Sequence, residues 1–343
     1  MRKLFALALL LLLLSCGPGR PRYVGISGYA QGGTYTVKVN LAGVPVPAQT
    51  VKDSIESLLL QIDTTLSGYN KRSLLSRFNA GEAVPATPLF LDMYRQAHRW
   101  WKLSGGSLDC AAGPIFDAWG FGFRNSEFPT DAQLDSLKKS CGMALLPAEL
   151  PVTDGKVDPA PLGYPRLNYN AIAQGYSCDL IAKYLYSIGV KDMLVDIGEI
   201  WCDGRNPSGK PWSVGIDRPV DQPDAVTLGE EGLEGIWSSG GHPAGIVTSG
   251  NYRKFYIRDG QKYAHTIDPV SARPVSHNLL SATVVSAESA ADADALATWC
   301  MILGPEKAKE LLEGDPALEG YLVWSAPDGS FREWASEGFT LKK

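Results

Sequence analysis

The chain lacks an excess of positive charge. Its 343 residues contain 32 lysine and arginine residues against 37 aspartate and glutamate residues, which gives a formal net charge of -5 at pH 7. A protein that coats nucleic acid needs a basic surface to neutralise phosphates, so we expect no nucleic-acid partner. Hydrophobic residues make up 45% and charged residues 20% of the chain. This composition is typical of a globular protein and argues against a disordered or fibrous one.

The signatures of common zinc sites, phosphate loops and solenoid repeats are also missing. The chain has no CxxC pair, no cluster of cysteine and histidine with zinc-site spacing, and no GxxxxGK(S/T) motif. No repeat of solenoid length is visible. Any chemistry must therefore come from other motifs.

The first 20 residues have the pattern of a targeting segment. A basic start, Arg2-Lys3, precedes an unbroken apolar run of 11 residues that ends at Leu14 and is too short for a comfortable membrane span. The sequence LLSC that ends at Cys16 resembles the lipobox of bacterial lipoproteins, in which cleavage leaves a lipidated cysteine. An ordinary signal peptide is the alternative, and the Gly/Pro/Arg linker that follows favours the lipoprotein.

This interpretation divides the chain into three parts. We expect a lipoprotein signal peptide at residues 1–15, a lipidated Cys16 with a linker at residues 16–27, and one folded domain at residues 28–343. The mature protein is expected to be anchored to a membrane outside the cytoplasm and to face the periplasm. Five cysteines remain beyond Cys16, so free buried thiols are expected, with one disulfide as the alternative.

Hydrophobic periodicity predicts helices and strands that are interspersed along the chain. Because the two kinds of element do not alternate strictly, the pattern favours an α+β fold over a doubly wound parallel sheet. Helices are expected at residues 49–66, 89–103, 131–140, 173–188 and 289–303, and strands at 35–40, 192–197, 212–216, 245–249, 254–257, 263–267 and 281–286.

The most specific local motif is AADADALAT, which begins at Ala290 near the start of the last expected helix. Asp294 and Thr298 are four residues apart, so their oxygens project from one face of a helix. They offer part of a magnesium shell, because Mg2+ prefers oxygen ligands and fills its remaining positions with water or phosphate. The alternative is that Asp292 and Asp294 stabilise the helix N-terminus electrostatically and Thr298 is only packed.

Three further segments carry polar groups at the ends of expected elements. Ser249 and Gly250 follow an expected strand and could present backbone N–H groups to a phosphate. His265 could move a proton near neutral pH, or it could be a hydrogen-bonded structural residue. Residues 167–179 join a strand to a helix with Asn170 as the expected cap, and a backbone carbonyl at such a transition can be free to bind a cation.

Taken together and in this order, the motifs resemble the ApbE family of FAD:protein FMN transferases. The resemblance runs from about Gln31 to about Gly304, and seven ordered motifs are far more specific than any one of them. Many members of that family are exported lipoproteins. The motifs are QGGTY from Gln31, LSGY from Leu66 with Ser73, Ser76 and Asn79, GSLD from Gly106 with Gly113-Pro114, residues 168–179, TSG from Thr248, HTIDP from His265 and DALAT from Asp294.

The resemblance implies a T-fold-like α+β architecture and a reaction. FAD would be cleaved at its pyrophosphate, FMN joined through a phosphoester to a threonine or serine hydroxyl of a partner protein, and AMP released. Mg2+ would neutralise charge on the diphosphate. The implied partners are subunits of flavin-carrying respiratory complexes. A Mg2+-dependent FAD pyrophosphatase that yields FMN and AMP is one alternative, and a non-catalytic flavin-binding lipoprotein is another.

The resemblance also assigns roles to single residues. Asp294 and Thr298 match metal-binding side chains, and Ala171 matches the position whose backbone carbonyl binds the metal. His265, before the Ile-Asp-Pro turn, is the candidate base. The positions matched to cofactor binding are Gln31, Tyr69, Ser107, Leu108, Asp109, Asn168, Gln174, Ser249, Gly250, Thr266 and Ile267.

Three of these positions depart from the commoner family pattern. Gln31 stands where methionine is usual on the flavin side. Asn168 and Gln174 stand where aspartate and lysine are usual, so one negative and one positive charge are missing together. Amide hydrogen bonds are expected to keep nucleotide binding, while the missing cation near the diphosphate bears on FAD affinity and turnover.

Overall fold

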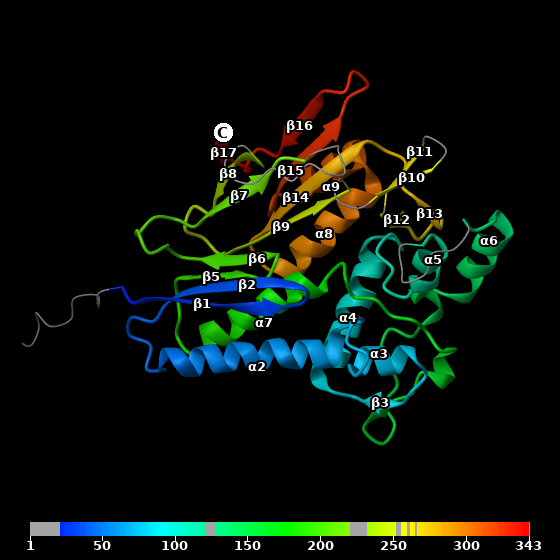
Figure 1. The fold of residues 1–343 in the computed structure, drawn as a ribbon, viewed down its shortest axis with the longest axis horizontal. Helices are drawn as coiled ribbons and strands as arrows, with labels where there is room; N and C mark the ends of the chain where they lie inside the picture. The colour runs from blue at the N-terminus through cyan, green and yellow to red at the C-terminus, as the bar shows by residue number, and fades with distance from the viewer. Residues whose placement is uncertain are drawn as a thin grey trace, which may run out of the picture.

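The computed structural model describes residues 21–120, 128–219, 232–251, 255–258, 261–264 and 266–342. Its centre is a sheet of eight strands in which every neighbouring pair runs antiparallel (Figure 1). With helices inserted between strands, this sheet confirms the expected α+β class. Across the sheet the strands follow the order β1 (Tyr23–Ala30), β2 (Gly33–Asn40), β5 (Met193–Asp196), β6 (Ile200–Asp203), β9 (Ala244–Gly250), β14 (Leu279–Ser286), β15 (Leu318–Ser325) and β16 (Phe331–Ala335).

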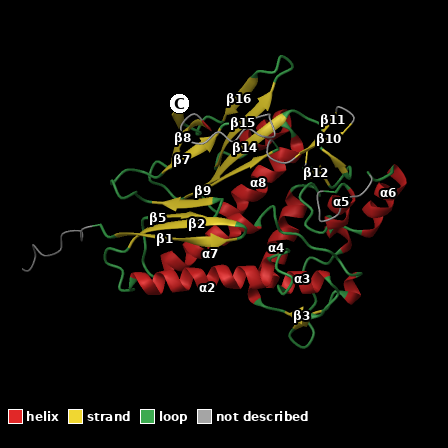
Figure 2. Ribbon diagram, viewed as in Figure 1, coloured by secondary structure: helices red, strands yellow, loops and turns green. Residues whose placement is uncertain are grey.

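Helices cover one face of this sheet (Figure 2). Val195 of β5 shares a core cluster with Ile55 and Ile181, and Val247 of β9 shares another with Ala293. Alternate strand residues point to this face, so its apolar side chains are buried against helices. These helices are α2 (Ala48–Leu66), α7 (Ala173–Ser187), α8 (Ala290–Leu303) and α9 (Pro305–Glu313).

The opposite face carries a smaller sheet. Its strands lie in the order β17 (Leu341–Lys342), β8 (Leu233–Ser238) and β7 (Ser213–Asp217). Leu194 and Ile246, which neighbour the helix-facing Val195 and Val247, are buried here with Trp212. The middle of the central sheet is therefore covered on both faces, which explains why β14 is buried along its whole length.

A mainly helical lobe lies beside the covered sheet (Figure 1). Its largest buried side chains include Phe78, Phe90 and Tyr94, which join the same core cluster as α8. The lobe and α8 therefore share one core. Its elements are α3 (Leu74–Asn79), β3 (Val84–Pro85), α4 (Pro88–Leu103), α5 (Gly113–Ala118), α6 (Asp131–Ser140) and β4 (Lys156–Val157), with the hairpins β10 (Phe255–Arg258)–β11 (Gln261–Ala264) and β12 (Ile267–Asp268)–β13 (Arg273–Pro274) nearby.

The five expected helices are present as α2, α4, α6, α7 and α8, and most expected strands are present within a few residues. Strand β1 starts at Tyr23, so regular structure begins inside the expected linker at residues 16–27. The alternating pattern of β1 is weak, because only Ile26 of its eight residues is buried. Short elements such as α3 and α5 were not expected, since six residues give too few turns for a clear period.

The five cysteines beyond Cys16 are free thiols, so the disulfide alternative is wrong. Within the described ranges, no helix combines the length and apolar character needed to cross a membrane. Cys16 itself lies outside the described residues.

The end of α8 is held by a half-buried neutral histidine. His277 Nε2 lies 3.0 Å from the Met301 carbonyl, and the Leu279 N–H donates to Nδ1 at 3.3 Å. Burial lowers the pKa of His277, although the Met301 carbonyl opposes this effect. The unfolded chain therefore binds the proton more readily, and the stabilising contribution of His277 is present above pH ~6.5 and lost as pH falls below that value.

We expect His277→Gln to remove this part of the acid sensitivity. The wild-type free energy of unfolding should fall more steeply than that of the variant between pH ~7 and 5, because protonation breaks the Leu279 bond, worth about 1 kcal/mol. Urea unfolding at several pH values measures the difference. Parallel pH profiles for the two proteins would contradict the assignment.

Candidate active site

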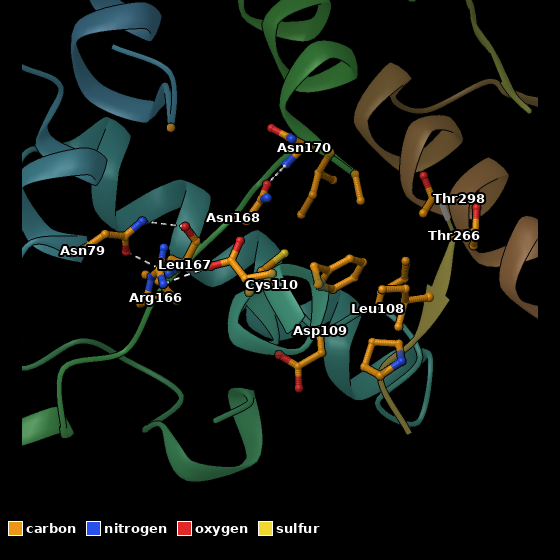
Figure 3. Close-up of a pocket in the computed structure, with 18 of the residues that line it drawn as sticks. Asn79, Leu108, Asp109, Cys110, Arg166, Leu167, Asn168, Asn170, Thr266 and Thr298 are labelled. Atoms are coloured by element: carbon orange, nitrogen blue, oxygen red, sulfur yellow. Dashed lines mark hydrogen bonds and ion pairs between the residues drawn. The ribbon is translucent and has the colours of Figure 1, made fainter. Parts of the chain in front are cut away.

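A cavity of about 1120 Å3 lies where α3, α4 and α5 of the lobe approach the start of α7 and one side of α8. Figure 3 shows Thr266 and Thr298 on one side of this cavity and Asn79 and Arg166 on the other. The structure brings nine of the sequence-predicted residues to its wall: Tyr69, Ser107, Leu108, Asp109, Asn168, Ala171, Thr266, Ile267 and Thr298. Segments that are far apart in the sequence therefore form one site.

The first turn of α7 leaves a backbone carbonyl open. In a regular helix the Gly175 N–H would donate to the carbonyl four residues earlier, that of Ala171. Here the Gly175 N–H donates to Asp294 Oδ2 at 3.1 Å instead. In the described part of the chain, neither the Ala171 carbonyl nor the Thr298 hydroxyl has a hydrogen-bond partner, and both residues line the cavity. One interaction of α8 with α7 thus frees an oxygen for a ligand.

Asp294 is buried, with 5% of its surface exposed. Burial raises its pKa to about 7, the Gly175 hydrogen bond lowers it, and the negative charge of Asp179 raises it. Burial also raises the pKa of Glu199, and the negative charge of Asp294 raises it further. Among the described residues, no lysine or arginine forms an ion pair with Asp294 or Glu199. This region of α8 therefore favours a bound cation.

The oxygens at this place fit a hard cation. The described residues contain no group of three or more histidine, cysteine, aspartate or glutamate side chains suited to a metal. A carboxylate, a hydroxyl and a carbonyl are nevertheless the ligand types that Mg2+ prefers, and a ligand phosphate commonly completes its shell. Ala171 and Thr298 at the cavity wall, with Asp294 bonded to Gly175 behind it, are thus the residues that could hold such an ion.

The opposite wall is rigid. Asn79 donates to the Leu167 carbonyl and accepts from the Leu167 N–H, both at 2.8 Å (Figure 3). The Asn168 N–H donates to the Cys110 carbonyl at 2.7 Å, and Asn168 Oδ1 accepts from the Asn170 N–H at 2.9 Å. These bonds fix the segment that leads to the open carbonyl of residue 171.

The side chain of Asp109 stabilises the loop in which it lies by hydrogen bonds to backbone N–H groups. One oxygen accepts from the Ala111 N–H at 2.8 Å, and both lie 3.0 Å from the Met143 nitrogen. Burial raises the pKa of Asp109, and these backbone bonds oppose the shift. The loop consequently offers a ligand its neighbouring Ser107 and Leu108, while the carboxylate stabilises the backbone.

Tyr69 stands at the cavity with 66% of its surface exposed. Its hydroxyl accepts a hydrogen bond of 3.3 Å from Asn170 Nδ2. An aromatic ring at the cavity suits stacking on a planar ligand.

Five predicted residues do not line the cavity: Gln31, Gln174, Ser249, Gly250 and Asp294. Gln31 sits in the β1–β2 turn with φ of 52° and donates to Ser177 of α7 at 2.6 Å, while Gln174 donates to the Ile197 carbonyl at 3.1 Å. Ser249 and Gly250 lie inside β9, paired with Ala282 and Ser281, rather than in a loop after a strand. His265 lies outside the described residues.

Other residues at the site were not predicted from the sequence. Asn251, which is buried, accepts a hydrogen bond of 2.5 Å from the Thr266 hydroxyl and so fixes that side chain at the cavity. Arg166 and Asp117 both line the cavity and form an ion pair of 2.9 Å. Asn251 follows the TSG motif directly, which was the available signal, whereas the Arg166–Asp117 pair depends on two segments meeting in space.

The model of the ApbE family matches residues 32–322, which is most of the sequence, so the chain belongs to the ApbE family. This confirms the resemblance found in the sequence.

Curated relatives and solved structures agree with the family. FAD:protein FMN transferase from Vibrio cholerae is 34% identical, over 98% of this chain and 97% of the relative. The protein of the same name from Escherichia coli K12 is 33% identical over 84% and 80%. The structure of the flavin transferase ApbE from V. cholerae matches with a TM-score of 0.75 at 31% identity, covering 92% of this chain and 98% of that one. The apo flavinyl transferase ApbE from Pseudomonas stutzeri has a TM-score of 0.77 at 30% identity, with 92% and 95% covered. The expectation of a transferase is confirmed.

Proposed function

We propose that this chain is a Mg2+-dependent FAD:protein FMN transferase that moves FMN from FAD to a threonine or serine hydroxyl of a partner protein and releases AMP. The observation that carries the proposal is the open Ala171 carbonyl, freed by Asp294 and accompanied by the Thr298 hydroxyl at one cavity. The volume of about 1120 Å3 suits a dinucleotide. Relatives that match most of the chain are named for this reaction.

A bound Mg2+ would neutralise the diphosphate and stabilise the charge that develops on the leaving AMP. Ala171, Asp294 and Thr298 would hold the ion from one side. The acceptor hydroxyl attacks the phosphorus on the FMN side of the diphosphate, and the bond from that phosphorus to the AMP oxygen breaks. The hydroxyl proton passes to a base, for which His265 is the candidate.

The remaining cavity residues would orient FAD. The ring of Tyr69 would stack on the flavin, and Ser107, Leu108 and Asn168 would contact the cofactor from the cavity wall. Thr266 and Ile267 would contact it from the opposite side. Four matched residues outside the cavity wall would support FAD binding indirectly, by holding α7 or β9 in place: Gln31, Gln174, Ser249 and Gly250.

The acceptor is proposed to be a subunit of a flavin-carrying respiratory complex, met at a membrane surface. The LLSC sequence supports lipidation of Cys16 and attachment to a membrane facing the periplasm. Because both the enzyme and such an acceptor would be confined to one surface, the anchor would raise their effective concentration.

A mass measurement tests the proposal. The full chain is incubated with FAD and a peptide that carries one acceptor threonine, with and without Mg2+, and the same peptide with valine at that position is the control. We expect the threonine peptide to gain the mass of FMN less one water only when Mg2+ is present, with AMP in equal amount.

Other outcomes point to the alternative functions. FMN and AMP without a peptide adduct would identify a FAD pyrophosphatase, in which water takes the place of the acceptor hydroxyl. A chain that binds FAD and leaves it intact with Mg2+ and acceptor present would be a flavin-binding protein. FMN transfer at the full rate in the presence of EDTA would show that the reaction needs no metal ion.

A further inference from the structure

We infer that Asp179 is a positioning residue for the proposed magnesium site, although it lies outside the cavity wall. This inference rests on the proposed function and concerns how α7 and α8 are held so that their oxygens meet. Ala171 lies two residues before the start of α7, whereas Asp294 and Thr298 belong to α8. The relative placement of these two helices therefore decides whether the three oxygens can share one ion.

Asp179 of α7 binds the N-terminus of α8 with both carboxylate oxygens. Oδ1 accepts from the Ala290 N–H at 2.8 Å, while Oδ2 accepts from the Ala291 N–H at 3.0 Å and the Ser289 hydroxyl at 2.7 Å. Such bonds satisfy orphan donors at a helix start, where the helix dipole also favours a negative charge. One side chain thus fixes the start of α8 on α7.

The two helices also approach each other too closely for any side chain at Gly175. A Cβ at this position would lie 2.2 Å from the Ala290 carbonyl oxygen. On the other side of α8, a Cβ at Gly245 of β9 would lie 2.5 Å from the Ala290 Cα. Ala290 is therefore confined between α7 and β9, next to the bonds made by Asp179, and α8 has little freedom to shift.

The close contact between Gly175 and Ala290 lies about one helical turn from a proposed ligand on each side. Ala171 is four residues before Gly175, and Asp294 is four residues after Ala290. The hydrogen bond from the Gly175 N–H to Asp294 is a second link between the two helices, and it leaves the Ala171 carbonyl open. Because Mg2+ demands near-ideal octahedral geometry, a small shift of α8 would spoil the set of oxygens.

Binding of the metal alone provides the test. Mn2+, which is visible by electron paramagnetic resonance, is titrated into the full chain in place of Mg2+. We expect Asp179→Asn to weaken Mn2+ binding at least tenfold, because asparagine keeps one acceptor oxygen while its NH2 group would face a donor of α8 that the carboxylate now binds. Ser289→Ala removes one of the three bonds and should weaken Mn2+ binding less, which supplies a milder variant if Asp179→Asn folds poorly.

Tyr176→Phe is the matched control. The Tyr176 hydroxyl donates to Asp92 of α4 at 2.6 Å, so the variant removes a tether of α7 next to Gly175 without touching α8. It should lower the melting temperature yet leave the Mn2+ affinity unchanged. If Asp179→Asn and Ser289→Ala lower stability but keep the wild-type Mn2+ affinity, the positioning role is overturned. If the wild type itself binds no Mn2+ and transfers FMN in EDTA, the metal in the proposed function fails instead.

Discussion

Replacing Asp294 by asparagine is expected to stabilise the metal-free protein and to abolish FMN transfer. Burial raises the pKa of Asp294 to about 7, far above the ordinary value of 3.8. Between these values the folded state binds more protons than the unfolded state, so the free energy of unfolding falls as pH rises through that range. Asparagine keeps an acceptor for the Gly175 N–H and carries no charge, so the variant should gain on the order of 2 kcal/mol at pH 8.

The same substitution removes the charged ligand from the proposed metal site. We expect the wild type to gain thermal stability on addition of Mg2+ and the variant to gain none. Melting curves at pH 5 and pH 8, with EDTA or with Mg2+, together with the acceptor-peptide assay, measure both effects. Metal binding by the wild type should strengthen as pH rises through about 7, because the ionised carboxylate is the ligand.

Asp292→Asn is the matched control on the same helix. Asp292 accepts hydrogen bonds from Arg99 and Trp100 of α4, at 2.6 and 3.2 Å, and is directed away from Gly175. Its replacement should destabilise the protein modestly and leave the Mg2+ response intact. If Asp294→Asn and Asp292→Asn were equally destabilising and equally active, both residues would serve the helix N-terminus alone.

His265→Ala is expected to slow FMN transfer by about 10²- to 10⁴-fold and to leave FAD affinity unchanged. A general base acts on the acceptor proton in the transition state, and its loss costs rates of this order without affecting the ground-state contacts of FAD. Single-turnover transfer to the threonine peptide gives the rate, and quenching of flavin fluorescence gives the affinity.

His242→Ala serves as the control for His265→Ala, because His242 does not line the cavity of the described structure. This variant should transfer FMN at the wild-type rate. Equal losses of rate and FAD affinity in His265→Ala would assign the histidine to binding and leave the base to another group. Rescue of His265→Ala by added imidazole would support the base directly.

The sequence predicted the long elements of the fold more reliably than the short ones. The helices α2 and α4 carry clear stripes of buried residues, such as Val51 and Ile55 or Met93 and Ala97, so their periods show in the sequence. Strand β6 has four residues and β1 has a single buried one, which leaves no period to read. Strand order could not be predicted, because the pairs β2–β5, β6–β9, β9–β14 and β14–β15 are formed across long connections.

The resemblance supplied motifs for several residues that the structure brings to one cavity, among them Tyr69, Ala171 and Thr298. Their roles at the site stay predictions. Motif order could not show that Gly250 also lies inside a strand, since its pairing with Ser281 of β14 depends on residues about thirty positions away. The hydrogen bond between Asn251 and Thr266 could not be predicted either, because it also joins residues that are distant in the sequence.

By itself the sequence determined the composition class, the main helices, and the oxygen-bearing side chains of Asp294 and Thr298 on one helical face, because these depend on local chemistry and the helical period. The tertiary structure alone decided that the Ala171 carbonyl is open. That carbonyl loses its helical partner since Asp294, more than a hundred residues away, takes the Gly175 N–H. Such an exchange requires α7 and α8 to touch at Gly175 and Ala290, and no local pattern specifies that contact.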